Sequence, residues 1–456
     1  MDRVDVFVIG GGGTGSEVAF SLARTSGMKV ALAERDKLGG ECNHYGCVPT
    51  KVMLRSAKIA ALAREADRFG VRIPEVEVDL KAVQQRARDV IDSQSGEGAA
   101  PFERVGVRVF LQEARLLGER RVELSDGTQF EADRVVLATG TAPEIPPIPG
   151  LHDGPFWTNK EAIWRPEAVP ESLVVIGTGA IGIEFSQIYA RFGARVTALE
   201  ALPHVLPQED EEAAASLVPA FEGEGITLMS AVRIERAVHD GAGWTVALDE
   251  KEPVIADELL VATGRRPVFD AHDLGASGVE LDDDENPILT DTLRTTNRNV
   301  WVAGDATGDL LFTHVGTYEA ELVVKDILDH PERRDYRVVP RVTFCDPEVA
   351  SVGLTERQAR DERGDVITSV VRFEDNERSH IEGSVHGLVK FVADRDTGEL
   401  LGGHIVGEEA GALIHQVVLL MSARVRAPAV ARAIHAYPTL SESVKAALLG
   451  IDGQVE

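Results

Sequence analysis

The chain has 456 residues, of which 44% are hydrophobic, and its formal net charge at pH 7 is −28. This length exceeds that of one ordinary domain, so about three domains are expected. The negative charge opposes binding to nucleic acid or to an anionic membrane, and the apolar runs are too short to span a bilayer. No basic leader precedes the first apolar run, so we expect a cytoplasmic protein.

The N-terminal segment combines a strand, a glycine turn, a helix and a second strand. Apolar, β-branched residues predict strands over 4–9 and 29–33, with helical spacing between them. Glycines of this spacing allow a tight turn and close approach of a pyrophosphate to a helix N-terminus, and an acidic residue after the second strand can accept a ribose hydroxyl. The residues concerned are Gly10, Gly12, Gly15 and Glu34.

Two cysteines follow this unit, separated by four residues. A disulfide between Cys42 and Cys47 would close a small ring and would be more easily reduced than a structural bond. A helix starting at Pro49 would place Cys47 at a helix N-terminus, where the partial charge favours the thiolate. Two alternatives are a pair of inert buried cysteines and half of a zinc site that uses His44, although Cys345 is then the one cysteine left to complete it.

The glycine signature occurs a second time in the chain. A strand over 173–176, a glycine turn, a helix and a strand over 195–199 repeat the first pattern, and an acidic residue again ends the unit. Two copies predict two nucleotide sites. The second set is Gly177, Gly179, Gly182 and Glu200.

The segments around the second copy indicate the domain organisation. Two strands end in matching Ala-Thr-Gly turns, and prolines between 143 and 149 mark a linker. A later strand ends in a Gly-Asp turn whose carboxylate could reach a cofactor hydroxyl or could simply form the turn. The turn residues are Thr139, Gly140, Gly264, Gly304 and Asp305.

From about residue 337 the pattern changes to an α+β module. Strands are predicted over 338–344, 366–372, 388–392 and 400–405, and helices over 410–425 and 441–449. We therefore predict an α/β fold with two Rossmann-like dinucleotide-binding domains and a C-terminal α+β domain. The predicted bounds are 1–149 and 266–336 for the first domain, 150–265 for the inserted second, and 337–456 for the third.

Taken together, these motifs resemble the flavoprotein disulfide reductases, the family of dihydrolipoamide dehydrogenase and mercuric reductase. The resemblance covers essentially the whole chain. It implies FAD in the first domain, a nicotinamide cofactor in the second, and a homodimer formed through the third. It also implies that Gly10, Gly12, Gly15, Glu34 and Asp305 serve FAD and that Gly177, Gly179, Gly182 and Glu200 serve the nicotinamide cofactor. Further cofactor-binding residues are expected at Lys51, Thr139, Gly140, Gly264 and Gly304.

The resemblance further assigns the reacting groups. Cys47 would lie next to the flavin and Cys42 would exchange with substrate, while Lys51 and Glu184 would pair near the flavin ring. Glu200 favours NADH over NADPH, because a carboxylate accepts a 2′-hydroxyl and repels a 2′-phosphate. No resident metal is implied.

The C-terminal tail departs from the disulfide-reducing members of the family. Where those members carry a histidine before the tail proline, this chain has Tyr437, and Glu442 follows. Tyrosine titrates near pH 10 and rarely serves as a base at neutral pH. The tail spacing is similar to that of mercuric reductase, but the C-terminal cysteine pair of that enzyme is missing.

Three functional hypotheses follow. The first is an FAD enzyme that passes electrons between NAD(H) and a small-molecule acceptor through Cys42 and Cys47, like dihydrolipoamide dehydrogenase. The tyrosine favours a metal ion, a quinone or a small oxidant as the acceptor instead of lipoamide. The second hypothesis is a subunit that docks in a multienzyme complex, and the third is a flavoenzyme whose cysteines are vestigial.

Overall fold

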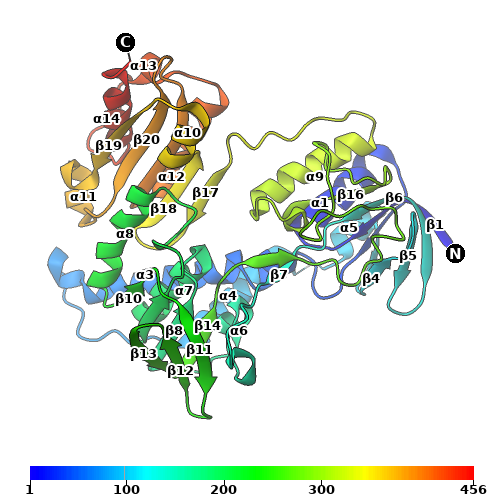
Figure 1. The fold of residues 1–456 in the computed structure, drawn as a ribbon, viewed down its shortest axis with the longest axis horizontal. Helices are drawn as coiled ribbons and strands as arrows, with labels where there is room; N and C mark the ends of the chain where they lie inside the picture. The colour runs from blue at the N-terminus through cyan, green and yellow to red at the C-terminus, as the bar shows by residue number, and fades with distance from the viewer. Residues whose placement is uncertain (97, 456) are drawn as a thin grey trace. The chain divides into compact units, whose positions relative to one another are not determined.

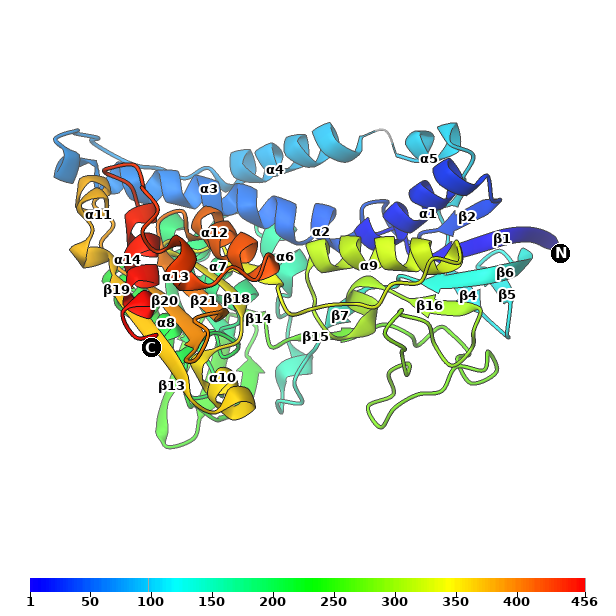
Figure 2. The same ribbon diagram turned by 90° about the horizontal axis from the view of Figure 1, so that it is seen from above.

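The computed structural model describes residues 1–96 and 98–455, and Figures 1 and 2 show it in two views. The chain forms two compact units. The first contains residues 1–49, 85–144 and 265–335, and the second contains 50–84, 145–264 and 336–456. The four-part domain division stays a prediction. Among the described residues, no helix is both long enough and apolar enough to cross a membrane.

The first unit is built on a seven-stranded sheet with the order β3-β2-β1-β6-β5-β4, in which β16 also pairs with β6. Strands β3, β2, β1, β6 and β16 run parallel, whereas β4 and β5 are antiparallel additions. The sheet strands are β1 (Asp2–Ile9), β2 (Val30–Ala33), β3 (Arg108–Phe110), β4 (Ala114–Leu116), β5 (Arg121–Leu124), β6 (Gln129–Leu137) and β16 (Val300–Val302).

Helices and short elements complete this unit. A small two-stranded sheet is formed by β7 (Thr141–Pro143) and β15 (Arg265–Pro267). The helices are α1 (Gly13–Ser26), α2 (Gly40–His44), α5 (Ala100–Arg104), η3 (Gly304–Thr307) and α9 (Thr313–Ile327); α3 (Cys47–Arg64) and α4 (Leu80–Ser95) belong partly to each unit.

The side chains of β1 point alternately to the two faces of the sheet and so contribute to two layers of the core of the first unit. Val6 and Val8 pack with residues of α1 and α9 on one face of the sheet. Phe7 and Ile9 pack with residues of β4, β5 and β16 on the other. Successive side chains of a strand point to opposite faces, so a buried strand needs apolar residues at every position. This explains the unbroken apolar run over residues 6–9 of β1.

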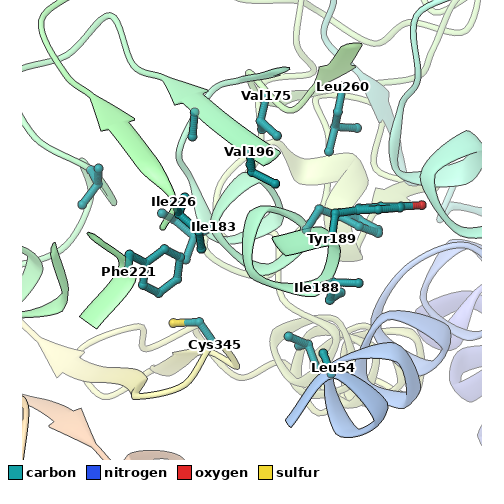
Figure 3. Packing of buried hydrophobic residues seen from close by; sticks show 14 of the residues in the cluster. Leu54, Val175, Ile183, Ile188, Tyr189, Val196, Phe221, Ile226, Leu260 and Cys345 are labelled. Carbon is teal, nitrogen blue, oxygen red and sulfur yellow. The ribbon is translucent and has the colours of Figure 1, made fainter. Parts of the chain in front are cut away.

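The second unit contains a four-stranded parallel sheet with the order β10-β9-β8-β14 and an antiparallel sheet with the order β11-β12-β13. Figure 3 shows its packed core, in which Tyr189 and Ile183 of α7 lie with Val196 and Leu260 of the sheet. The elements are η1 (Ala66–Phe69), η2 (Leu151–Asp153), α6 (Asn159–Trp164), β8 (Ser172–Ile176), α7 (Ala180–Phe192), β9 (Arg195–Leu199), α8 (Glu211–Gly223), β10 (Thr227–Met229), β11 (Ile234–His239), β12 (Trp244–Leu248), β13 (Lys251–Ala256) and β14 (Glu258–Val261).

The C-terminal part of the second unit is a five-stranded antiparallel sheet with the order β17-β18-β21-β20-β19. Helices α12 and α14 cover one face, and α10 packs on alternate residues of β19 and β20. The elements are β17 (Pro340–Thr343), β18 (Glu348–Gly353), α10 (Glu356–Arg363), β19 (Val366–Arg372), η4 (Phe373–Asp375), α11 (Glu377–Glu382), β20 (Leu388–Asp394), β21 (Leu400–Gly407), α12 (Ala410–Ser422), α13 (Ala427–Val430) and α14 (Ser441–Asp452).

The structure confirms the α/β class and corrects two details. Strand β18, which lies inside the C-terminal sheet, is missing from the predicted four strands; its run is short and follows Pro347, which suggests a turn. Helix α3 begins at Cys47, so Pro49 is its third residue and not its first. Proline is tolerated there because the first four N–H groups of a helix have no partner within the helix.

Candidate functional site

The first glycine turn, between β1 and α1, is closed by backbone contacts that leave no room for side chains. Gly10 has φ +105°, and a Cβ there would lie 2.1 Å from the carbonyl oxygen of Ala138. A Cβ on Gly15 would lie 2.0 Å from the carbonyl oxygen of Gly10. Around Gly12, by contrast, a Cβ would meet no heavy atom within 4 Å. The turn is therefore tightly packed on its inner side and open at the start of α1, as a dinucleotide phosphate requires.

Glu34 closes the same turn from the end of β2. Its Oε2 accepts a hydrogen bond from the Gly11 amide at 2.7 Å, and its Oε1 accepts one from the Asp36 amide at 2.8 Å. The residue is 8% exposed. Because a carboxylate offers about four lone-pair positions, it can still accept a ribose hydroxyl.

The second glycine turn, between β8 and α7, repeats this geometry. Gly177 has φ +96°, and a Cβ there would lie 2.4 Å from the carbonyl oxygen of Ala262. A Cβ on Gly182 would lie 1.9 Å from the carbonyl oxygen of Gly177, while the space around Gly179 is open. The two predicted repeats thus share a backbone arrangement as well as a spacing.

Glu200, which follows β9, occupies the place that Glu34 has in the first repeat. Its Oε2 accepts hydrogen bonds from the Thr178 amide at 2.9 Å and the Thr178 hydroxyl at 2.8 Å. Its Oε1 accepts one from the Leu202 amide at 3.0 Å. These three hydrogen bonds leave about one lone-pair position of the carboxylate for a ligand hydroxyl, whereas the two hydrogen bonds to Glu34 leave about two.

Several groups of the first unit fit FAD. The Thr139 hydroxyl is buried and has no hydrogen-bond partner among the described residues, so it can serve a bound group. Asp305 begins the turn after β16, and burial raises the pKa of its carboxyl, although the Arg265 guanidinium opposes that shift. Arg265 donates to the Thr141 hydroxyl at 2.8 Å and lies 3.3 Å from Glu41. The turn glycines of this unit, Gly140 (+68°) and Gly304 (+72°), have positive φ. Gly264 (+134°), which ends a segment of the second unit, has positive φ as well.

The segment that carries the cysteines is pinned to the first glycine turn. The Gly39 amide donates to the Gly11 carbonyl at 2.8 Å. Gly40 has φ +63°, and a Cβ there would lie 2.8 Å from Cα of Gly12. The two glycines before Cys42 are therefore required by this close backbone approach, which brings α2 to the start of α1.

Cys42 and Cys47 are brought together as two thiols. Cys42 is half-buried in α2, and Cys47 is exposed at the start of α3. A hydrogen bond with Cys47, and then burial, raise the pKa of the Cys42 thiol well above its usual range. The Thr313 hydroxyl donates to Cys42 Sγ at 3.2 Å and lies 4.0 Å from Cys47 Sγ. Two adjacent thiols that share a proton can form a disulfide and release it again.

Lys51 and Glu184 form a bidentate pair in the second unit. Lys51 Nζ lies 3.0 and 2.9 Å from the two oxygens of Glu184, whose side chain is 4% exposed. The Phe344 amide also donates to Glu184 Oε1 at 2.9 Å, and the lysine ammonium lies 4.8 Å from the centre of the Phe344 ring. The pairing of these two residues agrees with the sequence expectation, and their place near a flavin stays a prediction.

The tail gives Tyr437 and Glu442 different partners. The Glu442 carboxylate accepts from the Thr439 amide at 3.1 Å, at the start of α14. The exposed Tyr437 hydroxyl hydrogen bonds to the Glu377 carboxylate, which raises the pKa of the phenol. His435 hydrogen bonds with the Ala433 carbonyl at 3.1 Å. Tyr437 therefore remains protonated at neutral pH and can donate a hydrogen bond.

His44 and Cys345, which the alternative of a zinc site would use, have other surroundings in the structure. The Nε2 atom of His44 hydrogen bonds with the Leu38 carbonyl. Cys345 is fully buried in an apolar cluster with Phe221 and Ile183, and burial raises the pKa of its thiol (Figure 3). Cys345 is thus a small buried residue of the second unit, in the bend between β17 and β18.

Sequence reasoning missed four residues that contact the predicted site residues: Thr313, Arg265, Phe344 and Glu377. Arg265 directly follows the predicted Gly264, so its position in the turn was a usable signal. The other three are ordinary residues in elements remote along the chain, and no local pattern indicates them.

Known proteins resemble the chain along its whole length. Residues 4–320 match the family described as pyridine nucleotide-disulphide oxidoreductase, and residues 339–448 match its dimerisation domain. A dihydrolipoyl dehydrogenase of Chlorobaculum parvum is 37% identical over 98% of this chain and 96% of its own length. A mercuric reductase of Bacillus cereus is 32% identical over 99% of this chain and 72% of its own.

A solved structure extends the comparison. The Cu(II) complex of the HOCl-induced flavoprotein disulfide reductase RclA from Escherichia coli superposes with a TM-score of 0.88 at 25% identity. The superposition covers 98% of this chain and 99% of that chain.

Proposed function

Because the chain belongs to the pyridine nucleotide-disulphide oxidoreductase family, and is therefore a flavoprotein oxidoreductase that uses FAD and NAD(P)H, we propose that it reduces a small acceptor other than lipoamide with electrons from NADH. The observation that supports this most directly is the Cys42–Cys47 thiol pair beside the first glycine turn. The tail, which offers a tyrosine in place of an imidazole, supports the choice of acceptor.

The described residues suggest how the cofactors are held. The open N-terminus of α1, Glu34, Thr139 and Asp305 would hold FAD, and the open N-terminus of α7 and Glu200 would hold the nicotinamide cofactor. When bound, FAD supplies the exchange of an electron pair between nicotinamide and the disulfide.

Electrostatics around Glu200 favour NADH. The carboxylate is 7% exposed and stands after β9. A 2′-phosphate at this position would be repelled by the carboxylate, whereas a 2′-hydroxyl can donate a hydrogen bond to it.

The Cys42–Cys47 pair transfers the electrons to the acceptor. Reduction of the disulfide adds two electrons and opens the S–S bond to one thiolate and one thiol. Cys42 then attacks or reduces the acceptor, which is one two-electron acceptor such as a quinone or two equivalents of a one-electron acceptor such as Cu(II). The pair returns to the disulfide and releases the thiol proton, and both electrons leave with the acceptor. Lys51, held by Glu184, contributes positive charge, and Tyr437 contributes a hydrogen-bond donor.

Dihydrolipoamide oxidation needs a base that removes a thiol proton, and neither tail group suits that task. The Tyr437 phenol stays protonated beside Glu377, and Glu442 accepts a hydrogen bond from the Thr439 amide. A metal ion, a quinone or a small oxidant does not require proton removal from the substrate. The relative from E. coli is described as an HOCl-induced enzyme and was solved with Cu(II), so Cu(II) belongs in the acceptor panel.

The test is anaerobic turnover of the holoenzyme with dihydrolipoamide and NAD, comparing wild type with Tyr437→His. We expect the wild type to be slow and the histidine variant to gain activity. In parallel, NADH oxidation is followed with Cu(II), a benzoquinone and a low-molecular-weight disulfide. Fast oxidation of dihydrolipoamide by the wild type would refute the choice of acceptor and identify a dihydrolipoyl dehydrogenase.

A second variant separates the thiol route from direct reduction by the flavin. Cys42→Ala should lose acceptor reduction while still binding FAD and NADH. Retained turnover would instead show that the cysteines are vestigial. Cys345→Ala is the control for loss of a thiol that does not exchange with the acceptor. Because Cys345 follows Phe344, which contacts the Lys51–Glu184 pair, unchanged FAD and NADH binding of this variant is verified first.

We also propose a homodimer, supported by the dimerisation domain at residues 339–448. In this arrangement Tyr437 would enter the active site of the other subunit. Docking in a multienzyme complex remains an alternative, and size-exclusion chromatography distinguishes a discrete dimer from a larger assembly.

A further inference from the structure

The hydroxyl of Thr313 lies beside both reactive sulfurs. It donates to Cys42 Sγ at 3.2 Å and is 4.0 Å from Cys47 Sγ. The hydroxyl has a single proton, so at these distances the bond to Cys42 is the stronger of the two. All three residues belong to the first unit.

Packing fixes the orientation of this hydroxyl. Thr313 is the first residue of α9, and its methyl group faces Gly13, where a Cβ would lie 3.8 Å from it. A few residues later Gly316 allows α1 to approach closely, since a Cβ there would lie 2.2 Å from the Thr14 hydroxyl. The close contact between α9 and α1 therefore aims the threonine hydroxyl at α2.

A hydrogen bond donated to a cysteine sulfur stabilises the thiolate form of that cysteine. A hydrogen bond to an ionised acceptor is about twice as strong as one between neutral groups. The start of α9 also carries partial positive charge, which favours an anion nearby. In the reduced pair, the hydrogen bond with Cys47 and burial raise the pKa of the Cys42 thiol, and the hydrogen bond from Thr313 acts in the opposite direction and lowers it.

We propose that Thr313 is a positioning residue that stabilises negative charge on Cys42 Sγ and so assists Cys42 when it attacks the acceptor. This inference rests on the proposed function, in which Cys42 is the outer thiol. The other groups that face Cys42 are consistent with this role: Glu41 is paired with Arg265, and His44 is bonded to a backbone carbonyl.

Alkylation of the reduced holoenzyme tests the proposal without any acceptor. Iodoacetamide reacts with thiolates, and mass spectrometry of the cysteine peptides gives the rate at each sulfur between pH 5 and 9. In a Cys47→Ser background, Thr313→Val should slow alkylation of Cys42 at pH 7 about tenfold, because the thiol pKa rises by about one unit. With both cysteines present, the same change should shift alkylation from Cys42 toward Cys47.

Matched variants separate this effect from a structural one. Thr313→Ser keeps the hydroxyl and should retain the wild-type pH profile, and Thr313→Ala provides a second variant without it. Thr317→Val is the control, since its hydroxyl donates to the Thr313 carbonyl one turn along α9. Superimposable profiles for wild type, Thr313→Val and Thr313→Ala would overturn the proposal.

The outcome is independent of the acceptor test. If Cys42→Ala retains turnover, the proposed function fails whatever the alkylation shows. If Cys42→Ala is inactive but Thr313→Val leaves alkylation unchanged, the function stands and only the role of Thr313 is lost.

Discussion

Lys390 offers a quantitative test of the electrostatics in the second unit. The residue lies on β20 with its side chain 4% exposed, and its Nζ lies 2.9 Å from Asp210, 2.8 Å from Glu356 and 3.4 Å from Glu212. Asp210 caps α8, so the lysine joins that helix to the C-terminal sheet. Lys390→Met keeps most of the side-chain volume and removes the cation that the three carboxylates share.

The structure gives the size of the effect. Asp210 is as buried as the lysine, and removing one partner of a buried pair costs about 3–5 kcal/mol. Glu212 and Glu356 are 40% and 29% exposed and can be hydrated, so they add little. We expect a loss of roughly 4 kcal/mol, which lowers the midpoint of thermal unfolding by roughly 10 °C for a unit of this size.

Differential scanning calorimetry at pH 7.5 measures the shift. Lys81→Met is the matched control, since Lys81 pairs with Glu167 at 3.7 Å and both side chains are well exposed. Its effect should stay below about 0.5 kcal/mol. A Lys390→Met midpoint within about 2 °C of wild type would refute the reasoning, because the stranded carboxylates would then have found other compensation.

The pH dependence gives a second check on the same cluster. The hydrogen bond from Lys390 lowers the pKa of Glu356. Burial alone would raise the pKa of Asp210, but His404 and Lys390 outweigh it and the net shift is downward. Carboxyls with depressed pKa values stabilise the fold above their unfolded pKa and lose that contribution as the pH falls. The difference between wild type and Lys390→Met should therefore shrink from pH 7.5 to pH 4.

Three further predictions concern the nucleotide turns and a buried histidine. Glu200→Gln should lower the ratio of kcat/KM for NADH over NADPH about tenfold, because repulsion of the 2′-phosphate is removed; an unchanged ratio would contradict the assigned role. Gly182→Ala should unfold its domain in thermal melts, since its Cβ would meet the Gly177 carbonyl at 1.9 Å, whereas Gly179→Ala should fold but bind NADH more weakly in titrations. Burial lowers the pKa of His272 to about 4, so its contribution to stability is complete above about pH 6.5 and is lost as the pH falls toward 4. His272→Gln should therefore flatten the pH dependence of the free energy of unfolding between about pH 6.5 and about pH 4. An unaltered curve would count against this expectation.

The nucleotide turns were predictable because their cause is local. A strand, three glycines and a helix lie between Asp2 and Ser26. The residues that approach Gly10 and Gly177 closely, Ala138 and Ala262, each follow a strand of the same sheet. The acidic residues Glu34 and Glu200 follow the next strand, which is parallel to the first and therefore ends at the same edge of the sheet as the glycine turn. Because such patterns involve residues that are close in the sequence, they can be recognised in a single sequence.

The contacts that tune the thiols were not predictable in this way. Thr313 is separated from Cys42 by 271 positions, and nothing in the run around it distinguishes it from other threonines. Glu377 of α11 contacts Tyr437 across 60 positions, and no local pattern links the two residues. Strand β18 was missed because its short run follows a proline, although it lies between β17 and β21.

The acidic residues after β2 and β9 have a consequence for engineering. Glu34 and Glu200 each tie their own glycine turn together through backbone amides, in the same pattern. A protein engineer who replaces Glu200 with arginine to change the coenzyme would also remove the brace that shapes the turn. Coenzyme preference in this chain is therefore coupled to loop architecture, and a successful exchange requires a redesigned segment in place of a single substitution.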